Sequence, residues 1–228
     1  MHTVIAIDGP SGAGKGTVAR AVAAALGYRH IDTGAMYRAV AWRASQLGLD
    51  LDDGEAVLRV AQDAVIEVDG SRVVIDGTDV SEAIRTPEID RATTPVARQP
   101  RVRAELVARQ RALAAAGPVV MEGRDIGTVV FPDAQVKIYL DATPEERARR
   151  RAHDPAHTAA KTQALADIAQ AMQRRDENDR TRQASPLCIA SDATVIDTTG
   201  MPVADVVARV MAIVRGHESG RASAAQSP

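Results

Sequence analysis

The sequence is poor in aromatic residues, cysteine and long apolar runs. Only 2% of its 228 residues are Phe, Trp or Tyr, so a core must be built mainly from Ala, Val, Leu and Ile. Cys188 is the single cysteine, which excludes an intrachain disulfide. No stretch is long and apolar enough to span a membrane, and the start lacks the basic region and apolar run of a signal peptide. We therefore expect a soluble, cytoplasmic protein without a membrane partner.

An excess of charge of either sign is also lacking. The net charge is −2, which gives no argument for nucleic acid as a partner, and we expect none. Lysine is scarce among the cations: Lys15, Lys137 and Lys161 are the only lysines, and every other cation is arginine apart from histidine. Arginine offers a planar fork of donors that suits phosphate and carboxylate groups. A general bias toward arginine on the solvated surface nevertheless accounts for most of this excess.

Short apolar runs alternate with helical patterns along the chain. Five runs predict buried strands of a parallel sheet, at 4–7, 28–31, 118–121, 135–140 and 193–196. The main helices are expected at 18–26, 35–47, 100–116, 163–175 and 203–214. Strands that alternate with helices in this way indicate a doubly wound α/β domain.

Local signals add detail to this pattern. Alternating residues around the turn Asp69-Gly70 predict an antiparallel hairpin within 65–80, outside the parallel sheet. Thr86, followed by proline, begins a short helix, and Thr143 begins an arginine-rich helix through a capping box. The acidic stretch 52–55 lacks the remaining ligands of a calcium loop and predicts a solvated turn and helix start.

The strongest signal is a glycine-rich loop between the first predicted strand and the helix that follows it. Its residues are Gly9, Pro10, Ser11, Gly12, Ala13, Gly14, Lys15, Gly16 and Thr17. Glycines let consecutive N–H groups point at phosphate oxygens, and the helix adds its positive N-terminal end. Lys15 can reach the outer phosphates. The loop therefore predicts binding of a nucleoside triphosphate and transfer of its terminal phosphoryl group.

This loop departs from the strict pattern, which places Ser or Thr directly after the lysine. Gly16 stands at that position, and the hydroxyl is on Thr17. We therefore expect no direct protein ligand for the Mg²⁺ that accompanies ATP. Phosphates and water would hold the metal, and Thr17 would bond a phosphate.

Further segments narrow the class of enzyme. The loop resembles that of P-loop nucleoside monophosphate kinases, and four more segments resemble bacterial cytidylate kinases in order and spacing across about residues 3–215. These are Asp32-Thr33-Gly34-Ala35-Met36-Tyr37-Arg38, Pro100-Arg101-Val102-Arg103, Glu122-Gly123-Arg124-Asp125-Ile126-Gly127-Thr128, and Arg175-Asp176 with Asp179, Arg182 and Pro186-Leu187. The resemblance implies a three-layer α/β/α sandwich with a five-stranded parallel sheet, a small antiparallel insert and a lid. It implies ATP with Mg²⁺ as donor, and CMP and dCMP as acceptors.

The resemblance also implies an acceptor site. Arg38, Arg124 and Arg182 match positions that hold the acceptor's phosphate, and Arg175 and Asp179 match positions that contact its ribose. A cytosine-specific site needs groups that complement the base: Asp125 can accept from the amino group, and Arg103 can donate to the ring nitrogen and carbonyl. Thr33 and Thr94 match positions whose hydroxyls complete the base contacts. Tyr37 packs either beside the nucleotide or in the core.

The arginine-rich helix resembles one arm of a lid over ATP. Arg147 and Arg151 are four residues apart and share a helix face, from which they could stabilise the transferring phosphoryl group. With Lys15 and Arg124 they form the expected catalytic set. A solvated basic face is the rival interpretation for each arginine of this helix.

We expect one kinase domain over 1–215 that acts as a monomer. Its core covers 1–59, 86–146 and 162–215, with a monophosphate-binding insert at about 60–85, a lid at about 147–161 and a disordered tail at 216–228. Two rivals stay open. A similar kinase could act on UMP, AMP or shikimate, although Arg103 and Asp125 favour cytosine. A non-enzymatic nucleotide sensor or NTPase switch would not need the acceptor arginines.

Overall fold

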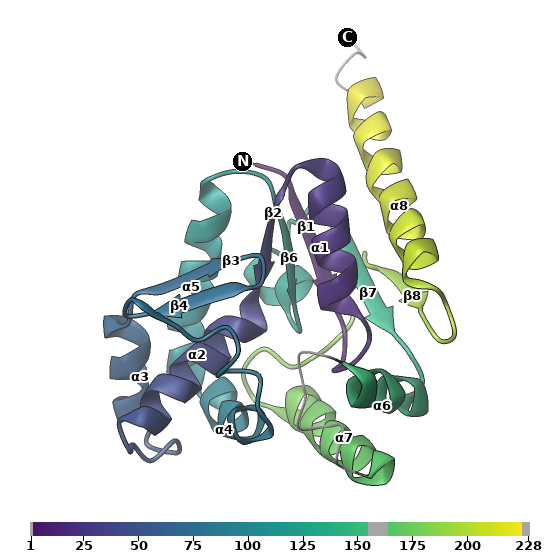
Figure 1. Ribbon diagram of the computed structural model, residues 1–228. Coiled ribbons are helices and arrows are strands. Elements are labelled where there is room, and N and C mark those ends of the chain that lie inside the picture. Colours follow the sequence, from purple (N-terminus) through teal and green to yellow (C-terminus); the bar gives the residue numbers. More distant parts are fainter. Residues whose placement is uncertain (1, 155–163, 225–228) are drawn as a thin grey trace.

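Five parallel strands form the centre of the protein (Figure 1). The computed structural model describes residues 2–154 and 164–224. The strands are β1 (Val4–Asp8), β2 (Arg29–Asp32), β6 (Val119–Gly123), β7 (Val136–Asp141) and β8 (Thr194–Asp197), in the sheet order β2-β6-β1-β7-β8. The predicted parallel sheet is confirmed, and every strand lies within two residues of its expected bounds.

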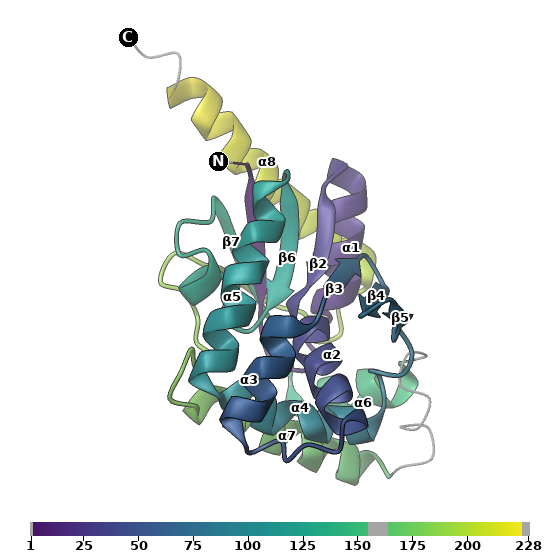
Figure 2. The same ribbon diagram turned by 90° about the vertical axis from the view of Figure 1, so that its left-hand side faces the viewer.

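Helices cover both faces of this sheet, as the two views show together (Figures 1 and 2). On one face lie α1 (Lys15–Leu26) and α8 (Val203–Ala224), and on the other lies α5 (Pro100–Ala115). The alternation along β1 explains both contacts: Ile5 and Ile7 pack with α1 and α8, whereas Val4 and Ala6 pack with α5. The three-layer sandwich is therefore confirmed.

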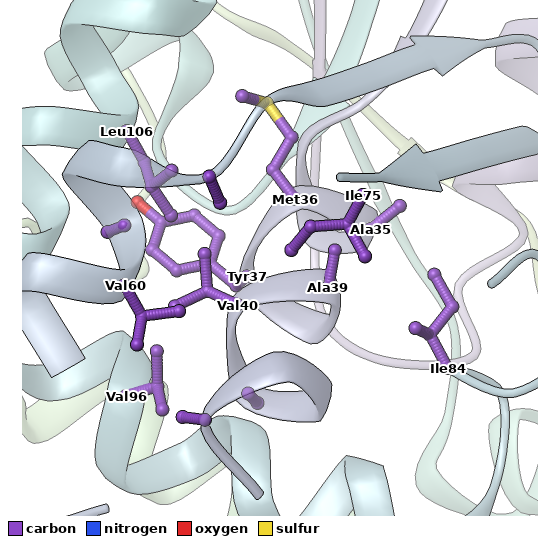
Figure 3. Close-up of a cluster of buried hydrophobic side chains, with 14 of the residues drawn as sticks. Ala35, Met36, Tyr37, Ala39, Val40, Val60, Ile75, Ile84, Val96 and Leu106 are labelled. Carbon is purple, nitrogen blue, oxygen red and sulfur yellow. The ribbon is translucent and has the colours of Figure 1, made fainter. Parts of the chain in front are cut away.

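A second group of elements builds its own core beside the sheet. It comprises α2 (Thr33–Gln46), α3 (Gly54–Asp63), β3 (Ile66–Asp69), β4 (Arg72–Ile75), β5 (Thr78–Asp79) and α4 (Pro87–Arg98). Figure 3 shows side chains from α2, α3, α4, β4 and α5 converging, among them Met36, Val60, Ile75, Val96 and Leu106. The three short strands are antiparallel, which confirms the predicted insert, and Asp53 caps α3, which confirms the predicted helix start.

Two helices extend beyond the carboxyl ends of the strands. They are α6 (Pro144–His153) and α7 (Leu165–Thr181), which pack together through Ala148, Ile168 and Met172. The side chain of Thr143 accepts from the N–H of Glu146, so the predicted cap of α6 is confirmed. Figures 1 and 2 show α4, α6 and α7 gathered at this end of the sheet. The part of the expected lid at 155–161 lies outside the described residues.

The C-terminal segment differs from its expectation. A disordered tail was expected from 216, but α8 continues to Ala224, with only 225–228 outside the described residues. The first half of α8 is anchored in the core by Val206, Val210 and Val214. Once a helix is nucleated by such packing, each added residue costs little, because only nucleation is expensive. Among the described helices, none is long and apolar enough to cross a lipid bilayer.

Candidate active site

The glycine-rich loop turns tightly between β1 and α1. Gly9 has a φ of +148°, and a β-carbon there would lie 2.0 Å from the carbonyl oxygen of Leu140, so a side chain does not fit. Gly14, in the left-handed conformation, is the N-cap of α1 and supplies no side-chain hydrogen bond to the first N–H groups of the helix. These N–H groups and the positive end of the helix are therefore available to a phosphate in front of the loop.

Lys15 folds back onto this loop. Its Nζ donates to the carbonyl oxygen of Pro10 over 2.6 Å, and its side chain is buried. Burial lowers the pKa of Lys15 to about 7, and the positive charge of Arg124 acts in the same direction. A phosphate beside Nζ would favour the ammonium form again, because it supplies an opposite charge.

A cleft of about 620 Å³ opens in front of the loop, between the sheet and helices α2, α4, α6 and α7. It brings together most residues that the sequence assigns to substrate binding or catalysis. From the loop these are Ser11, Gly12, Ala13, Gly14, Lys15, Gly16 and Thr17; from the rest of the chain they are Thr33, Tyr37, Arg38, Arg103, Arg124, Asp125, Arg151, Arg175, Asp179 and Arg182. The cleft is therefore the candidate active site.

Four assigned residues do not line this cleft. Gly9 and Pro10 belong to the loop but do not face the cleft. Gly9 packs closely against the backbone of Leu140, and the carbonyl oxygen of Pro10 accepts a hydrogen bond from Lys15. Thr94 lines a neighbouring hollow of about 310 Å³, which Asp179 and Arg182 also border. The adjacent Thr93 lines the main cleft instead, but its hydroxyl already donates to the carbonyl oxygen of Ile89 over 2.6 Å. The fourth residue is Arg147.

Arg147 requires a correction. Its guanidinium was expected to reach a transferring phosphoryl group, but it is buried and donates to the carbonyl oxygens of Ser11, over 3.0 Å, and Ala142, over 3.1 Å. It also forms a short ion pair with Asp176, whose other oxygen accepts from the N–H of Ser11 over 3.1 Å. Helix α6 turns this residue under the phosphate loop rather than into the cleft. Arg147 and Asp176 therefore clamp the loop to α6 and α7.

Buried charges meet at one end of the cleft. Arg103 and Asp125 form a short ion pair, and both side chains are almost fully buried. The guanidinium of Arg103 also lies over the ring of Tyr37, 5.2 Å from its centre. Among the described residues, Nε of Arg103 has no hydrogen-bond partner. A buried donor without a partner is costly, which suggests that a ligand completes this corner.

The backbone directly after Asp125 is held by a long-range contact from β1. Both carboxylate oxygens of Asp8 accept backbone N–H groups, from Ile126 over 2.9 Å and from Gly127 over 2.7 Å. Burial raises the pKa of Asp8 to about 6 although these bonds oppose the shift. The same contact fixes the start of η1 (Ile126–Val130), a short π-helix that the sequence did not predict. Asp125 thus projects from a rigid backbone.

Three arginines surround Asp179 on α7. Nε of Arg124 lies 2.9 Å from one carboxylate oxygen and a terminal nitrogen of Arg182 lies 3.1 Å from the other. Burial favours the neutral acid, but the charges of Arg124, Arg175 and Arg182 prevail and hold the pKa of Asp179 below its ordinary value. The second terminal nitrogen of Arg182 makes no hydrogen bond among the described residues, but it lies 3.7 Å from a carboxylate oxygen of Asp125. This region is suited to an anion.

Arg38 is held beside the loop by Asp32. Its guanidinium lies 2.7 Å from the Asp32 carboxylate, which also caps α2 by accepting from the N–H of Ala35 over 3.1 Å. Burial would raise the pKa of Asp32, but Arg38 and Arg85 outweigh it and lower this pKa to about 2. Arg38 is therefore pre-positioned at the cleft wall.

Three further residues of the site received no individual role from the sequence, although Arg150 belongs to the arginine-rich helix that resembles a lid over ATP. Asp90 on α4 pairs with both Arg151 and Arg175, at 2.9 Å from the latter, and so links α4 to α6 and α7. Arg150 lines the cleft and donates to the carbonyl oxygen of Thr198 over 2.6 Å. Glu122, a member of a segment that carries the resemblance, also lines the cleft. No sequence spacing connects these partners, which come together only in the folded chain.

Comparison with known proteins identifies relatives over nearly the whole chain. A family model described as cytidylate kinase matches residues 5–216. A cytidylate kinase of Pelotomaculum thermopropionicum is 50% identical over 218 residues, covering 92% of this chain and 95% of that protein. One from Desulfitobacterium hafniense is 47% identical over 212 residues, covering 92% and 91%. A crystal structure of a gluconokinase from Sinorhizobium meliloti covers 97% of each chain with a TM-score of 0.50 at 16% identity, a likeness of fold alone.

Proposed function

The chain belongs to the cytidylate kinase family, and from this premise we propose how its cleft works. The protein is a phosphotransferase that converts CMP to CDP with ATP as the donor. The observation that carries the proposal is the family match over residues 5–216. The cleft supports it, because a phosphate loop and a set of arginines suited to a second anion face the same space.

The donor nucleotide would bind with its triphosphate on the loop from Ser11 to Thr17. Backbone N–H groups and the N-terminus of α1 would hold the phosphates, and Lys15 would move from Pro10 to the outer phosphates. Arg150 and Arg151 reach the cleft from α6. Arg147 would act from beneath, by keeping the loop in its shape.

The acceptor would bind at the opposite end. Asp125 and Arg103 would read the cytosine, with Thr33 and Tyr37 beside them, and Arg38, Arg124 and Arg182 would hold the monophosphate. Arg175 and Asp179 would contact the ribose. Thr94 remains a proposed base contact, although it borders the neighbouring hollow. A buried donor without a hydrogen-bond partner among the described residues, Nε of Arg103, supports a ligand here.

Transfer needs no covalent intermediate on the protein. The acceptor phosphate oxygen attacks the terminal phosphorus of ATP, the bond to the bridging oxygen breaks, and ADP leaves. Lys15, Arg124 and Arg151 would neutralise the negative charge spread over the transferring group. Holding both nucleotides in line while excluding water supplies much of the acceleration.

Mg²⁺, bound with ATP, would offset charge on the phosphates. Gly16 offers no hydroxyl to this ion, so phosphates and water would hold most of its coordination sphere. dCMP as a second acceptor, a monomeric state and a cytoplasmic location remain predictions.

An acceptor screen tests the proposed function. Purified protein is incubated with labelled ATP and either CMP, dCMP, UMP, AMP or shikimate, and labelled product is measured. Phosphorylation of CMP far above UMP and AMP is the expected outcome. Preference for another acceptor would favour a different small-molecule kinase. Tight ATP binding without turnover of any acceptor would favour a nucleotide sensor.

A further inference from the structure

Asp125 is the N-cap residue of η1, but among the described residues its side chain bonds none of the first N–H groups of that helix. Two other aspartates at helix starts behave differently. The carboxylate of Asp32 accepts from an N–H of α2, and that of Asp53 accepts from two N–H groups of α3. Aspartate is favoured at such positions because its carboxylate satisfies N–H groups that the helix leaves free. The carboxylate of Asp125 is thus withheld from its usual local task.

The missing cap of η1 is supplied by Asp8 from β1. The Asp8 carboxylate accepts from the N–H groups of Ile126, over 2.9 Å, and Gly127, over 2.7 Å, which are the first two residues of η1. Asp8 is 5% exposed and lies 118 residues from Ile126 in the sequence. Buried N–H groups without an acceptor are costly. Asp8 therefore meets a demand that would otherwise fall on Asp125.

The backbone around Asp125 has little room to move. A β-carbon at Gly127 would lie 3.1 Å from Cδ of Lys137 and 3.5 Å from Oδ2 of Asp8, so the segment is packed from both sides. The carbonyl oxygen of Asp125 accepts from the N–H groups of Val129, over 2.9 Å, and Val130, over 3.1 Å. With the backbone fixed, the remaining freedom at Asp125 is the direction of its side chain.

That side chain points toward the base-reading corner of the cleft. One carboxylate oxygen of Asp125 forms the short ion pair with Arg103, and the other lies 3.7 Å from a terminal nitrogen of Arg182. An N-cap aspartate readily turns back to bond N–H groups two or three residues on. If Asp8 did not hold the start of η1, this local bond would compete with the contacts to Arg103 and to a base.

We propose that Asp8 is a positioning residue for the choice of acceptor base: it caps η1 in place of Asp125 and so leaves the Asp125 carboxylate free to face the amino group of cytosine. Asp8 is not among the described residues that line the cleft, so it acts through Asp125. The proposal rests on the proposed function, because it requires Asp125 to read the base.

Kinetics with two acceptors test the proposal. Asp8→Asn keeps the size of the side chain, but its amide accepts through one oxygen only and leaves one N–H of η1 for Asp125. The ratio of kcat/KM for CMP to that for UMP is expected to narrow on the order of tenfold, mainly through a higher KM for CMP.

Asp53→Asn is the matched control for this substitution. Asp53 also accepts from two consecutive N–H groups, those of Glu55 and Ala56, over 3.0 and 3.1 Å, but it is not among the described residues that line the cleft. The variant should lose some thermal stability through the weakened cap and leave the CMP/UMP ratio within about twofold.

A double variant separates positioning from a structural role. In the Asp125→Ala background, Asp8→Asn should narrow the ratio no further, because no carboxylate remains to be misdirected. If Asp8→Asn does not fold, Asp8→Ser, which is smaller and accepts through its hydroxyl, must still narrow the ratio and must do so only while Asp125 is present.

Three results would overturn the proposal. They are an unchanged ratio in folded Asp8→Asn, equal slowing of both acceptors, and a narrowing that persists in the Asp125→Ala background. Equal slowing would mean that Asp8 supports the fold and not the base reader. Wild-type protein without a preference for CMP over UMP would overturn the proposed function itself, whereas a wild-type preference that Asp8 does not affect rejects only this inference.

Discussion

At the scale of single residues, the burial of Lys15 has a measurable consequence. The pKa of Lys15 is about 7 in the free protein, because burial and the charge of Arg124 disfavour the ammonium form. A bound triphosphate favours that form and raises the pKa. ATP binding at about pH 8 is therefore expected to take up on the order of one proton, and the uptake should vanish at about pH 5.5, where Lys15 is already charged.

Calorimetry in buffers of different ionisation enthalpy measures this uptake. Lys15→Met keeps most of the aliphatic stem and removes the titrating group, so the variant should fold, take up no extra proton and lose nearly all turnover. Near-normal kcat in a folded Lys15→Met or Lys15→Ala variant would remove the phosphate-loop mechanism from consideration.

The pair of Asp125 and Arg103 sets the expected choice of base. A carboxylate only accepts hydrogen bonds, so Asp125 suits the amino group of cytosine and not the carbonyl at the same position of uracil. Asp125→Ala should therefore cost CMP more than UMP. The ratio of kcat/KM values for the two acceptors should narrow about ten- to a hundredfold, from roughly 1.5–3 kcal/mol for a charge-assisted hydrogen bond.

Arg124→Ala is the control for base choice, because both acceptors carry the same phosphate. It should depress kcat/KM for CMP and UMP about equally. Removing Asp125 also leaves Arg103 buried without its ion-pair partner. Thermal unfolding of the variant must therefore be measured beside its kinetics. Equal slowing of both acceptors by Asp125→Ala would mean that Asp125 does not read the base.

The sequence predicts which residues line the cleft better than it predicts which side chains contact them. Lys15, Arg38, Arg103 and Asp125 were assigned from local motifs, and all of them line the cleft. Arg147 was misplaced because a four-residue spacing gives a shared helix face but not the direction of that face. The contact of His30 with Glu122 spans 92 residues. Such pairings depend on strand order and on the direction in which helices pack, which local sequence patterns do not encode.

At the scale of secondary-structure elements, the clamp between α6, α7 and the phosphate loop should be a major source of stability. Arg147 and Asp176 are both buried, so removing either one leaves an uncompensated charge. Arg147→Ala or Asp176→Ala is expected to lower the free energy of unfolding by about 3–5 kcal/mol. The double variant Arg147→Ala/Asp176→Ala should lose clearly less than the sum of the two single changes.

Urea unfolding of the single and double variants measures this coupling. The exposed pair of Arg91 and Glu88 on α4 is the control, with both side chains 70% exposed. Glu88→Gln should change stability by no more than about 0.5 kcal/mol. Additive losses at Arg147 and Asp176 would contradict the clamp.

Element boundaries were largely predictable because they are encoded locally. Apolar runs ended by glycine, proline or aspartate gave all five strands of the sheet, and Thr86 and Thr143 marked two helix starts. The π-helix η1 was missed because it depends on Asp8, 118 residues away from Ile126. The end of α8 was missed because its polar, small residues resemble those of a disordered tail.

At the scale of the whole molecule, three parts surround the cleft: the sheet with its loop, the insert with α4, and helices α6 and α7 (Figure 1). Asp90 links the second part to the third, through Arg151 and Arg175. Both arginines line the cleft, where bound nucleotides would offer them phosphate or ribose oxygens instead. The bound nucleotides would then become the link between α4 and the two helices α6 and α7.

If the arginines exchange Asp90 for nucleotide oxygens, the cleft is expected to close only when both nucleotides are bound. A transferable phosphoryl group must be shielded from water, and either nucleotide alone supplies only half of the new contacts. Hydrogen exchange is therefore expected to slow in 65–85 and in 147–154 when a non-reacting ATP analogue and CMP are bound together, and to slow less with either one alone.

The far half of α8 provides the internal control. From about 216 onward it extends past the sheet, away from the cleft, and its exchange should not change (Figure 2). Unchanged protection in both cleft segments would count against closure, whereas equal slowing throughout α8 would indicate general stabilisation by ligand rather than movement of the insert and lid.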